Sequence, residues 1–429
     1  MNRFLYSCLL YLATPFIVIR LLVRAIRAPA YLKRWSERFA WYGGPARKPI
    51  DIIIHAVSVG EVHAALPLIR KLPGQDAALR ILVTTMTPTG SARVMALSED
   101  RIDHVYLPYD LPGAVNRFLN HWQPRVLVIM ETELWPNLIH ACKRRGIRTF
   151  VASARLSEKS EAGYARFNPL VKHMLAELDR VSTQSEADSK RLQNLGLPEP
   201  RVVVTGNLKY DMDLDKVQLD QARRDKATLG GRPVLIAAST RVLDGVVEDH
   251  KVLEAYRLLQ LSHPELLLVL VPRHPERFNN VYTLISEHGL KAVRRSQGQV
   301  VEQEHQVLLG DTMGEMAYFY GLADVAFVGG SLVDTGCQSI IEPAALGLPV
   351  ITGPSLFNFQ AVSEALQEAG GMTVVTNEDG LAATVKTLLE EPALCRTMGD
   401  AASSVVKANQ GAVDRNLAII SELLASAAR

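Results

Sequence analysis

The sequence predicts an α/β protein with two domains, each built on a parallel β-sheet with helices on both faces. The chain has 429 residues, which is too long for one ordinary hydrophobic core. Its composition, 48% hydrophobic and 21% charged, is that of a folded globular protein. From residue 50 onward, short apolar runs alternate with helical patterns or turns, as in doubly wound parallel sheets.

Residues 1–30 are predicted to form a membrane anchor or a helix that lies in the membrane interface. The stretch Phe4–Ile19 is largely apolar, although a spanning helix needs roughly twenty such residues. Arg20 and Arg24 follow it, and no small-residue cleavage site is present. Basic residues there attract anionic lipid and keep the rest of the chain on the cytoplasmic side. A buried first helix of a soluble domain is the alternative.

The remaining chain divides into two α/β halves of similar size. We expect a first domain at 31–210, a linker at 211–231 and a second domain at 232–429 that ends in a helix. The polar, charged composition after Met212 indicates the linker. The predicted strands of the first domain are 51–56, 80–85, 104–107, 125–130, 149–152 and 202–205. Those of the second lie in PVLIAAS, LLLVLVP, KAVRR, QVLLGD, VAFVGG, PVITGP and MTVV.

The totals of charged, cysteine and histidine residues exclude some classes of function. A formal net charge of +2 does not suggest a nucleic-acid-binding protein. The cysteines are scattered, which indicates free thiols in a reducing compartment. The histidines show no metal-ligand spacing, so we expect them on the surface or hydrogen-bonded, and we expect no metal site. The cysteines are Cys8, Cys142, Cys337 and Cys395, and the histidines in question, eight of the eleven in the chain, are His63, His104, His121, His140, His173, His250, His263 and His305.

Several polar motifs follow predicted strands of the first domain, at the edge where open parallel sheets bind ligands. In HAVSVGE, Glu61 stands near a helix start, where an acid interacts well with the helix dipole. It equally suits a general base in a cleft, and the spacing does not decide between these interpretations. ETELWPN places Glu131 and Glu133 after another strand. In TMTPTGS, Thr87 or Thr89 is either a helix cap or a ligand contact.

The second domain carries motifs typical of anion binding. VPRHPERF places Arg273, His274 and Arg277 after a strand, and arginine pairs well with phosphate. GDTMGEM is a glycine-containing loop that opens a helix, where free N–H groups accept phosphate. Neither motif is a Walker or dinucleotide fingerprint. In FVGGSLVDTGCQSIIEP, Glu342 is either a helix-dipole acid or a partner for two ribose hydroxyls.

Nine motifs together carry a resemblance to a known family. They are HAVSVGE, TMTPTGS, VYLPYDLP, METELWPN, ASARLSEKS, TGNLKYD, VPRHPERF, GDTMGE and AFVGGSLV, in that order. Over nearly its whole length the chain resembles the 3-deoxy-D-manno-octulosonate (Kdo) transferases of lipopolysaccharide biosynthesis. The resemblance implies a GT-B fold, in which two Rossmann-like doubly wound domains face a cleft, with an N-terminal membrane-associated helix.

The resemblance also implies an activity and its partners. The acceptor, a lipid A precursor such as lipid IV(A), would bind the first domain, and the donor, CMP-Kdo, the second. The reaction would be an inverting Kdo transfer at the cytoplasmic side of the inner membrane, without a cofactor or metal. Two alternatives stay open: a nucleotide-sugar epimerase of the same architecture, and a non-catalytic, membrane-attached nucleotide-sugar-binding protein.

Carried over position by position, the resemblance assigns Glu61 as the catalytic base. Glu342 would be the ribose contact within the CMP site. Lys209 in GNLKYD is a separate candidate for the donor phosphate, because a cation near the linker would face the donor. The full set expected at the CMP site is Pro272, Arg273, Met313, Gly314, Glu315, Ser339, Ile340, Ile341 and Glu342.

The chain departs from the family pattern in two loops. Where the family usually reads GGHNPLEP, this chain reads GCQSIIEP, so Gln338 replaces a histidine. Where the family usually reads STHEGEE, this chain reads STRVLDGVVED, with extra residues and Arg241 in place of a histidine. We expect Glu248 and Asp249 to replace the family's paired acids.

Overall fold

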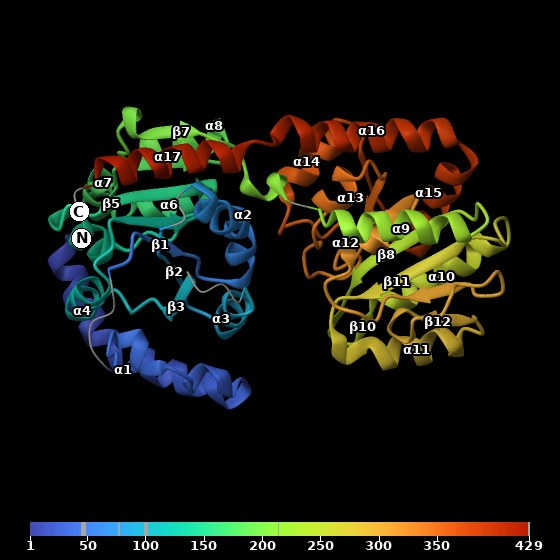
Figure 1. The fold of residues 1–429 in the computed structure, drawn as a ribbon, viewed down its shortest axis with the longest axis horizontal. Helices are drawn as coiled ribbons and strands as arrows, with labels where there is room; N and C mark the ends of the chain where they lie inside the picture. The colour runs from blue at the N-terminus through green and yellow to red at the C-terminus, as the bar shows by residue number, and fades with distance from the viewer. Residues whose placement is uncertain (44–48, 76–77, 98–101, 213, 428–429) are drawn as a thin grey trace. The chain divides into compact units, whose positions relative to one another are not determined.

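The computed structural model describes residues 1–43, 49–75, 78–97, 102–212 and 214–427. The chain forms two compact units (Figure 1). Unit 1 comprises Met1–Asp211 and Gln410–Arg429, and unit 2 comprises Met212–Asn409. Each unit contains a parallel sheet, so the predicted fold class of two parallel-sheet α/β domains is confirmed.

The described part of unit 1 contains a seven-stranded parallel sheet in the order β3-β2-β1-β4-β5-β6-β7. Strand β1 lies between β2 and β4, and Ile53 pairs in register with Leu82 and Leu127. All three side chains are wholly buried. The strands are β1 (Ile52–His55), β2 (Ile81–Thr85), β3 (Ile102–Tyr106), β4 (Val126–Met130), β5 (Arg148–Ala154), β6 (Arg180–Thr183) and β7 (Val202–Val204).

Helices cover both faces of this sheet because alternate strand residues enter two separate cores. Helices α4, α5, α7 and α8 pack with Ile53 on one face. Helices α2, α3 and α17 pack with Ile52 and Ile54 on the other. The helices are α2 (Val59–Gln75), α3 (Pro88–Met95), α4 (Pro112–Trp122), α5 (Pro136–Arg144), α6 (Glu158–Ala165), α7 (Asn168–Glu177), α8 (Glu186–Asn194) and α17 (Ala412–Ser426).

The last helix corrects the predicted domain boundary. The second domain was expected to run from 232 to 429, but α17 belongs to unit 1. Its residues Leu417 and Ile420 enter the core formed with α2 and the sheet. The Asp211 carboxylate accepts hydrogen bonds from the N–H groups of Gly411 (2.6 Å) and Val413 (2.5 Å). The apolar face of α17 therefore completes unit 1.

The predicted linker, 211–231, is also mostly structured. Helix α9 (Lys216–Thr228) occupies it and packs on α12 (Met316–Leu322) in unit 2. The Tyr318 hydroxyl donates to Asp225 at 2.9 Å, and Lys226 Nζ lies 2.7 Å from Asp324. Residue 213 lies outside the described residues. Most of the polar stretch is therefore the first helix of unit 2.

The described part of unit 2 also holds a seven-stranded parallel sheet, in the order β12-β13-β11-β8-β14-β15-β16. Its strands are β8 (Val234–Thr240), β11 (Leu267–Pro272), β12 (Ala292–Arg294), β13 (Val307–Leu309), β14 (Val325–Val328), β15 (Val350–Thr352) and β16 (Met372–Val374). Its further helices are α10 (Glu248–Gln260), α11 (Phe278–Glu287), α13 (Ile341–Ala345), α14 (Gln360–Glu368), α15 (Glu378–Glu390) and α16 (Pro392–Asn409). Two cores, one on each face, again bury the strands on both sides.

A small antiparallel hairpin lies in the STRVLDGVVED loop, one of the two that depart from the family pattern. It pairs β9 (Val242–Leu243) with β10 (Val246–Val247). The two turn residues, Asp244 and Gly245, have φ values of 48° and 83°. Asp-Gly with both φ values positive favours a two-residue hairpin turn. The extra residues of this loop thus form a short β-hairpin.

Helix α1 (Arg3–Arg27) is long and apolar enough to cross a membrane by length and composition. Only 11% of its most apolar stretch is buried. Part of it contacts unit 1. The Tyr6 hydroxyl donates to Asp110 at 3.1 Å, and the Ser7 hydroxyl donates to Asn137 at 3.0 Å. Other side chains point to the exterior, including Leu12 (72% exposed) and Phe16 (73% exposed). The predicted helix is present, with one polar edge held by unit 1.

Candidate active site

Doubly wound folds bind ligands at the central point where the strand order reverses, beyond the carboxyl ends of the strands. In unit 1 this point lies between β1 and β4. Glu61 follows β1 in the first turn of α2, and the loop after β4 carries Glu131 and Glu133. In unit 2 it lies between β8 and β14, which end at Thr240 and Val328. The candidate residues therefore belong to two sets, one in each unit.

Glu61 lies in the first turn of α2, and its carboxylate is held by the residues before the helix. One carboxylate oxygen accepts a hydrogen bond from the Val57 N–H at 2.8 Å. The other accepts from the Ser58 hydroxyl at 3.0 Å. This arrangement resembles a capping box, in which a serine and a glutamate satisfy a helix start together. The helix-start interpretation of Glu61 is therefore correct for its geometry.

The electrostatic surroundings of Glu61 also suit a base. Burial raises its pKa to about 7, against the opposing hydrogen bond from Val57. The charges of Glu131 and Glu133 raise it further. Burial likewise raises the pKa of Glu133. A carboxylate that titrates near neutral pH is well matched to proton transfer in that range. The two interpretations of Glu61 are thus compatible, since the capping hydrogen bonds fix the orientation of the carboxylate and burial raises its pKa.

The loop after β4 has a strained backbone. Glu131 has a φ of 54°, and its N–H donates to the Ala152 carbonyl at 2.9 Å. Non-glycine residues rarely adopt such φ values, and they gather at functional sites. On the neighbouring TMTPTGS turn, the Thr87 hydroxyl accepts from the Gly90 N–H at 3.2 Å. Thr87 is therefore the cap of α3.

Lys209 lies with the acids of unit 1. It belongs to a short 3-10 helix, Leu208–Asp211, and its Nζ lies 3.9 Å from Glu131 Oε1. The structure therefore brings Lys209 together with Glu131, whereas the other predicted donor residues are all in unit 2. A cation here offsets the mutual repulsion of the carboxylates at this strand end.

In unit 2, the structure brings Arg273 together with the GCQSIIEP loop. Arg273 Nε donates to Gln338 Oε1 at 3.2 Å, and its backbone N–H donates to the Thr240 carbonyl at 3.1 Å. Burial raises the pKa of Glu342 to about 7, while a hydrogen bond from Ser339 and the charge of Arg273 oppose that rise. Gln338, the residue that departs from the family pattern, thus orients the predicted phosphate-binding arginine.

Not every predicted donor residue offers its side chain. Ile340 and Ile341 are wholly buried, backbone included, so the structure does not expose either residue to a ligand. The Glu315 carboxylate is held by Arg295 at 2.8 Å and 3.3 Å, and this lowers its pKa. Met313 is 59% exposed, and Gly314 has a φ of 83°. Pro272 ends β11 immediately before Arg273. The 313–315 loop therefore exposes Met313 and the backbone at Gly314, while Arg295 holds the Glu315 carboxylate in place.

Glu248 holds two loops of unit 2 together, a role that the sequence did not indicate. Its carboxylate is fully buried and accepts four backbone hydrogen bonds. The donors are the N–H groups of Arg241 (3.0 Å), Gly330 (2.6 Å), Ser331 (3.1 Å) and Leu332 (2.9 Å). Glu248 therefore joins the loop after β8 to the loop after β14. The sequence signal for it was its correspondence to one of the family's paired acids in the STRVLDGVVED loop.

The predicted cluster of basic residues after β11 is divided in the structure. Arg277 forms an ion pair with Asp249, which is wholly buried and also accepts from the Thr240 hydroxyl. Arg277 therefore has a structural role. His274 contacts Arg241 through ring Nε2 at 3.1 Å, and its pKa is lowered by burial and by that arginine. Arg273 is the member of the cluster best placed to bind an anion.

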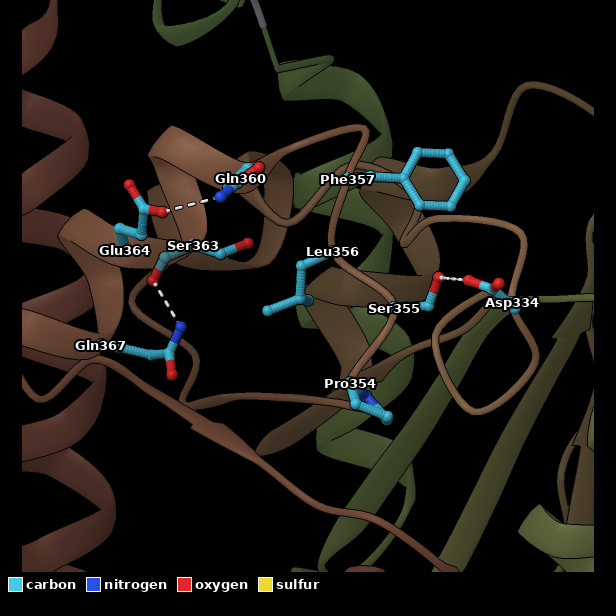
Figure 2. Close-up of a pocket in the computed structure, with 9 residues that line it drawn as sticks. All are labelled: Asp334, Pro354, Ser355, Leu356, Phe357, Gln360, Ser363, Glu364 and Gln367. Carbon is cyan, nitrogen blue, oxygen red and sulfur yellow. Dashed lines mark hydrogen bonds between the residues drawn. The ribbon is translucent and has the colours of Figure 1, made fainter. Parts of the chain in front are cut away.

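A separate hollow of about 390 Å³ lies after β15 in unit 2 (Figure 2). Its polar groups largely pair with one another, as in the contacts of Ser355 with Asp334 (2.8 Å) and Gln360 with Glu364 (3.1 Å). Two carboxylates and no lysine or arginine line it, so a nucleotide phosphate is poorly matched to it. The lining residues are Asp334, Pro354, Ser355, Leu356, Phe357, Gln360, Ser363, Glu364 and Gln367.

Two family models together match most of the chain. Residues 33–212 match the family model described as 3-deoxy-D-manno-octulosonic-acid transferase (kdotransferase), and residues 235–405 match that of glycosyl transferases group 1. The chain is 40% identical to the 3-deoxy-D-manno-octulosonic acid transferase of Haemophilus influenzae, over 99% of each chain. It is 37% identical to that of Bordetella pertussis, over 99% of this chain and 100% of that protein.

Solved structures of low identity share the fold. The chain is similar to a glycosyltransferase from Rickettsia africae, with a TM-score of 0.55 and 15% identity over 88% of this chain and 99% of that one. It is also similar to UDP-GlcNAc 2-epimerase from Neisseria meningitidis, with a TM-score of 0.56 and 14% identity over 88% and 100%. These likenesses confirm the predicted GT-B class. They concern the fold alone, so they do not support the epimerase alternative.

Proposed function

Because the chain belongs to the 3-deoxy-D-manno-octulosonic acid (Kdo) transferase family, we propose that it transfers Kdo from CMP-Kdo to a lipid A precursor such as lipid IV(A). The chain is a glycosyltransferase of lipopolysaccharide biosynthesis. The observation that carries the finer proposal is Glu61, a half-buried carboxylate with a pKa of about 7 at the carboxyl end of β1. A sugar hydroxyl must lose a proton as it forms a new glycosidic bond, and Glu61 is suited to accept it.

The proposed reaction is an inverting displacement. Glu61 takes the proton from a hydroxyl of the acceptor, and the hydroxyl oxygen forms a bond to the anomeric carbon of Kdo. The bond between that carbon and the CMP phosphate oxygen breaks on the opposite face. Arg273 and the backbone around Gly314 would meet the charge that develops on the leaving CMP. This scheme gives no role to a metal ion or cofactor.

The donor would be held in unit 2 by the remaining residues of the predicted set. Glu342 would accept hydrogen bonds from the ribose hydroxyls, since the hydrogen bond from Ser339 and the charge of Arg273 favour its ionised form. Met313 is exposed and could contact the donor directly, whereas the buried Ile340 and Ile341 would support the site from below its surface. Lys209 stays a candidate for the donor phosphate. Its ion pair with Glu131 supports a further role, in setting the charge beside the base.

The acceptor is a lipid, so we propose that α1 lies in the membrane interface. The exposed face of α1 carries large apolar side chains, while Tyr6 and Ser7 bind it to unit 1. A helix held along unit 1 in this way favours an interfacial position over a spanning one. Arg20 and Arg24 in the same helix suit the anionic lipids of the cytoplasmic leaflet.

Replacing both Leu12 and Phe16 by aspartate should reduce membrane binding at least tenfold, because burying each side chain contributes about 1.5–3 kcal/mol. Co-sedimentation with vesicles that contain anionic lipid would measure the bound fraction. Leu261→Asp, at an equally exposed leucine in unit 2 (85% exposed), is the control and should bind as the wild type does. Equal binding of all three proteins would contradict the interfacial position.

The transfer itself is tested with the purified chain, CMP-Kdo and a tetraacyl lipid A precursor, in the presence of EDTA. Mass spectrometry of the lipid should show the addition of one or more Kdo units, with release of an equal amount of CMP. Release of CMP without a gain in lipid mass would point to a different acceptor. Neither product, with CMP-Kdo still bound, would instead support a non-catalytic binding protein.

A further inference from the structure

Two helices of unit 1 bring together three side chains that can ligate a metal ion. His140 lies on α5, and His173 and Glu177 lie four residues apart on α7. Their ligand atoms all lie within 4.8 Å of one another. The sequence spacing of the histidines predicted no metal site. Sequence spacing alone does not reveal this group, because the packing of α5 on α7 supplies a potential ligand from a distant part of the chain.

The distances are close to those that a bound ion requires. Zinc–nitrogen and zinc–oxygen bonds of about 2.0–2.2 Å in a tetrahedral site place two ligand atoms roughly 3.3 Å apart. His173 Nε2 already lies 3.4 Å from Glu177 Oε1. His140 Nδ1 lies 2.6 Å from the same oxygen, as a hydrogen bond. An ion that replaces the proton of this hydrogen bond needs the two groups to part by less than about 1 Å.

The surroundings of the three side chains also favour a cation. Glu177 and His140 are largely buried, with exposed side-chain fractions of 13% and 20%. The second carboxylate oxygen of Glu177 is buried and has no hydrogen-bond partner among the described residues. A buried carboxylate oxygen without a partner is unfavourable. His173 is 64% exposed, which leaves the site open to an ion and to a water as its fourth ligand.

We propose that His140, His173 and Glu177 bind one divalent transition-metal ion, zinc(II) above all. Imidazole ligands favour zinc and its neighbours, whereas magnesium and calcium prefer all-oxygen sites. The bound ion would fasten α5 to α7. Helix α5 begins directly after the loop that carries Glu131 and Glu133, so the site would stiffen the support of that loop and take no part in the chemistry. This inference does not depend on the proposed transfer reaction.

The test uses the full chain after dialysis against a chelator. Calorimetric titration with zinc chloride should give one equivalent bound, and the temperature of unfolding should rise with zinc but not with magnesium. Cobalt(II) should give the visible absorption of a tetrahedral site. Glu177→Gln and His140→Ala should each weaken zinc binding at least about tenfold.

The control is His250→Ala. It removes one ring of another histidine pair, His250 and His288, whose ring centroids lie 5.5 Å apart, and it should leave zinc affinity unchanged. Circular dichroism of each variant before titration separates lost ligation from lost folding. Wild-type binding below one equivalent, or folded Glu177→Gln and His140→Ala variants with wild-type affinity, would overturn the site. The three side chains would then be a hydrogen-bonded contact between two helices only.

Discussion

Replacing Glu61 by glutamine should lower kcat for Kdo transfer by about 10²–10⁴-fold, the usual contribution of a general base. Glutamine keeps the size of the side chain. Its carbonyl oxygen can accept from the Val57 N–H, and its amide N–H₂ can donate to the Ser58 hydroxyl oxygen, in place of the two hydrogen bonds that hold the glutamate. It cannot take up a proton at neutral pH. The helix start should therefore survive while the chemistry is lost, and steady-state release of CMP in the presence of acceptor would measure this.

The pH profile sharpens the same prediction. Burial raises the pKa of Glu61 to about 7, and a base acts only in its ionised form. The wild-type rate should therefore rise with pH through about 7 and level off above it, whereas the residual rate of the glutamine variant should lack that step. Glu186→Gln, at an exposed acid in the first turn of α8, is the matched control. If Glu61→Gln lost stability but kept its rate, Glu61 would be a helix cap alone.

Replacing Glu248 by alanine should destabilise unit 2 by at least about 3 kcal/mol. The substitution leaves four buried backbone N–H groups without their acceptor, and each such group costs roughly 1–3 kcal/mol. Unfolding in urea, followed by circular dichroism, would measure the loss. Glu254→Ala is the control, because Glu254 is an exposed acid on the same helix, α10.

Glu248→Gln separates folding from donor binding. Glutamine fills the same space but turns an amide N–H₂ toward backbone donors, so the loops after β8 and β14 should shift while unit 2 stays folded. We expect KM for CMP-Kdo to rise at least about tenfold, with little change in KM for the lipid acceptor. A folded Glu248→Gln variant with an unchanged KM for both substrates would show that the two loops do not shape the donor site.

Local patterns predicted most of the fold. Runs such as Ile52–Ile54 are apolar at every position, as strands buried on both faces must be, and such runs led to strands in both sheets. Strand β6, Arg180–Thr183, was missed because buried Ser182 and Thr183 interrupt its apolar pattern. Helix α17 was recognised but assigned to the wrong unit. An amphipathic pattern shows that a helix has an apolar face and does not show which core receives it.

The candidate site was predictable where a motif lies within one short stretch. Glu61 follows its strand directly, and Arg273 does the same in unit 2. Glu248 was not recognised as a structural centre because three of its four partners lie beyond residue 329, on a loop that only the sheet brings near. The burial of Ile340 and Ile341 and the pairing of Lys209 with Glu131 likewise depend on tertiary contacts. In each case the residue type suggested a role, but the tertiary contacts determined which role the residue has.

The return of α17 to unit 1 has a consequence for synthesis on the ribosome. Unit 2 is one uninterrupted stretch, Met212–Asn409, whereas unit 1 is made of the two ends of the chain. Domains generally fold as units during translation, so unit 2 has its whole sequence available while unit 1 still lacks α17. A stop codon near residue 410 would leave unit 2 intact and uncover Val128 and Phe150, core residues on the strands β4 and β5 that α17 contacts. A lesion at the carboxyl terminus would thus damage the amino-terminal unit, where Glu61 resides.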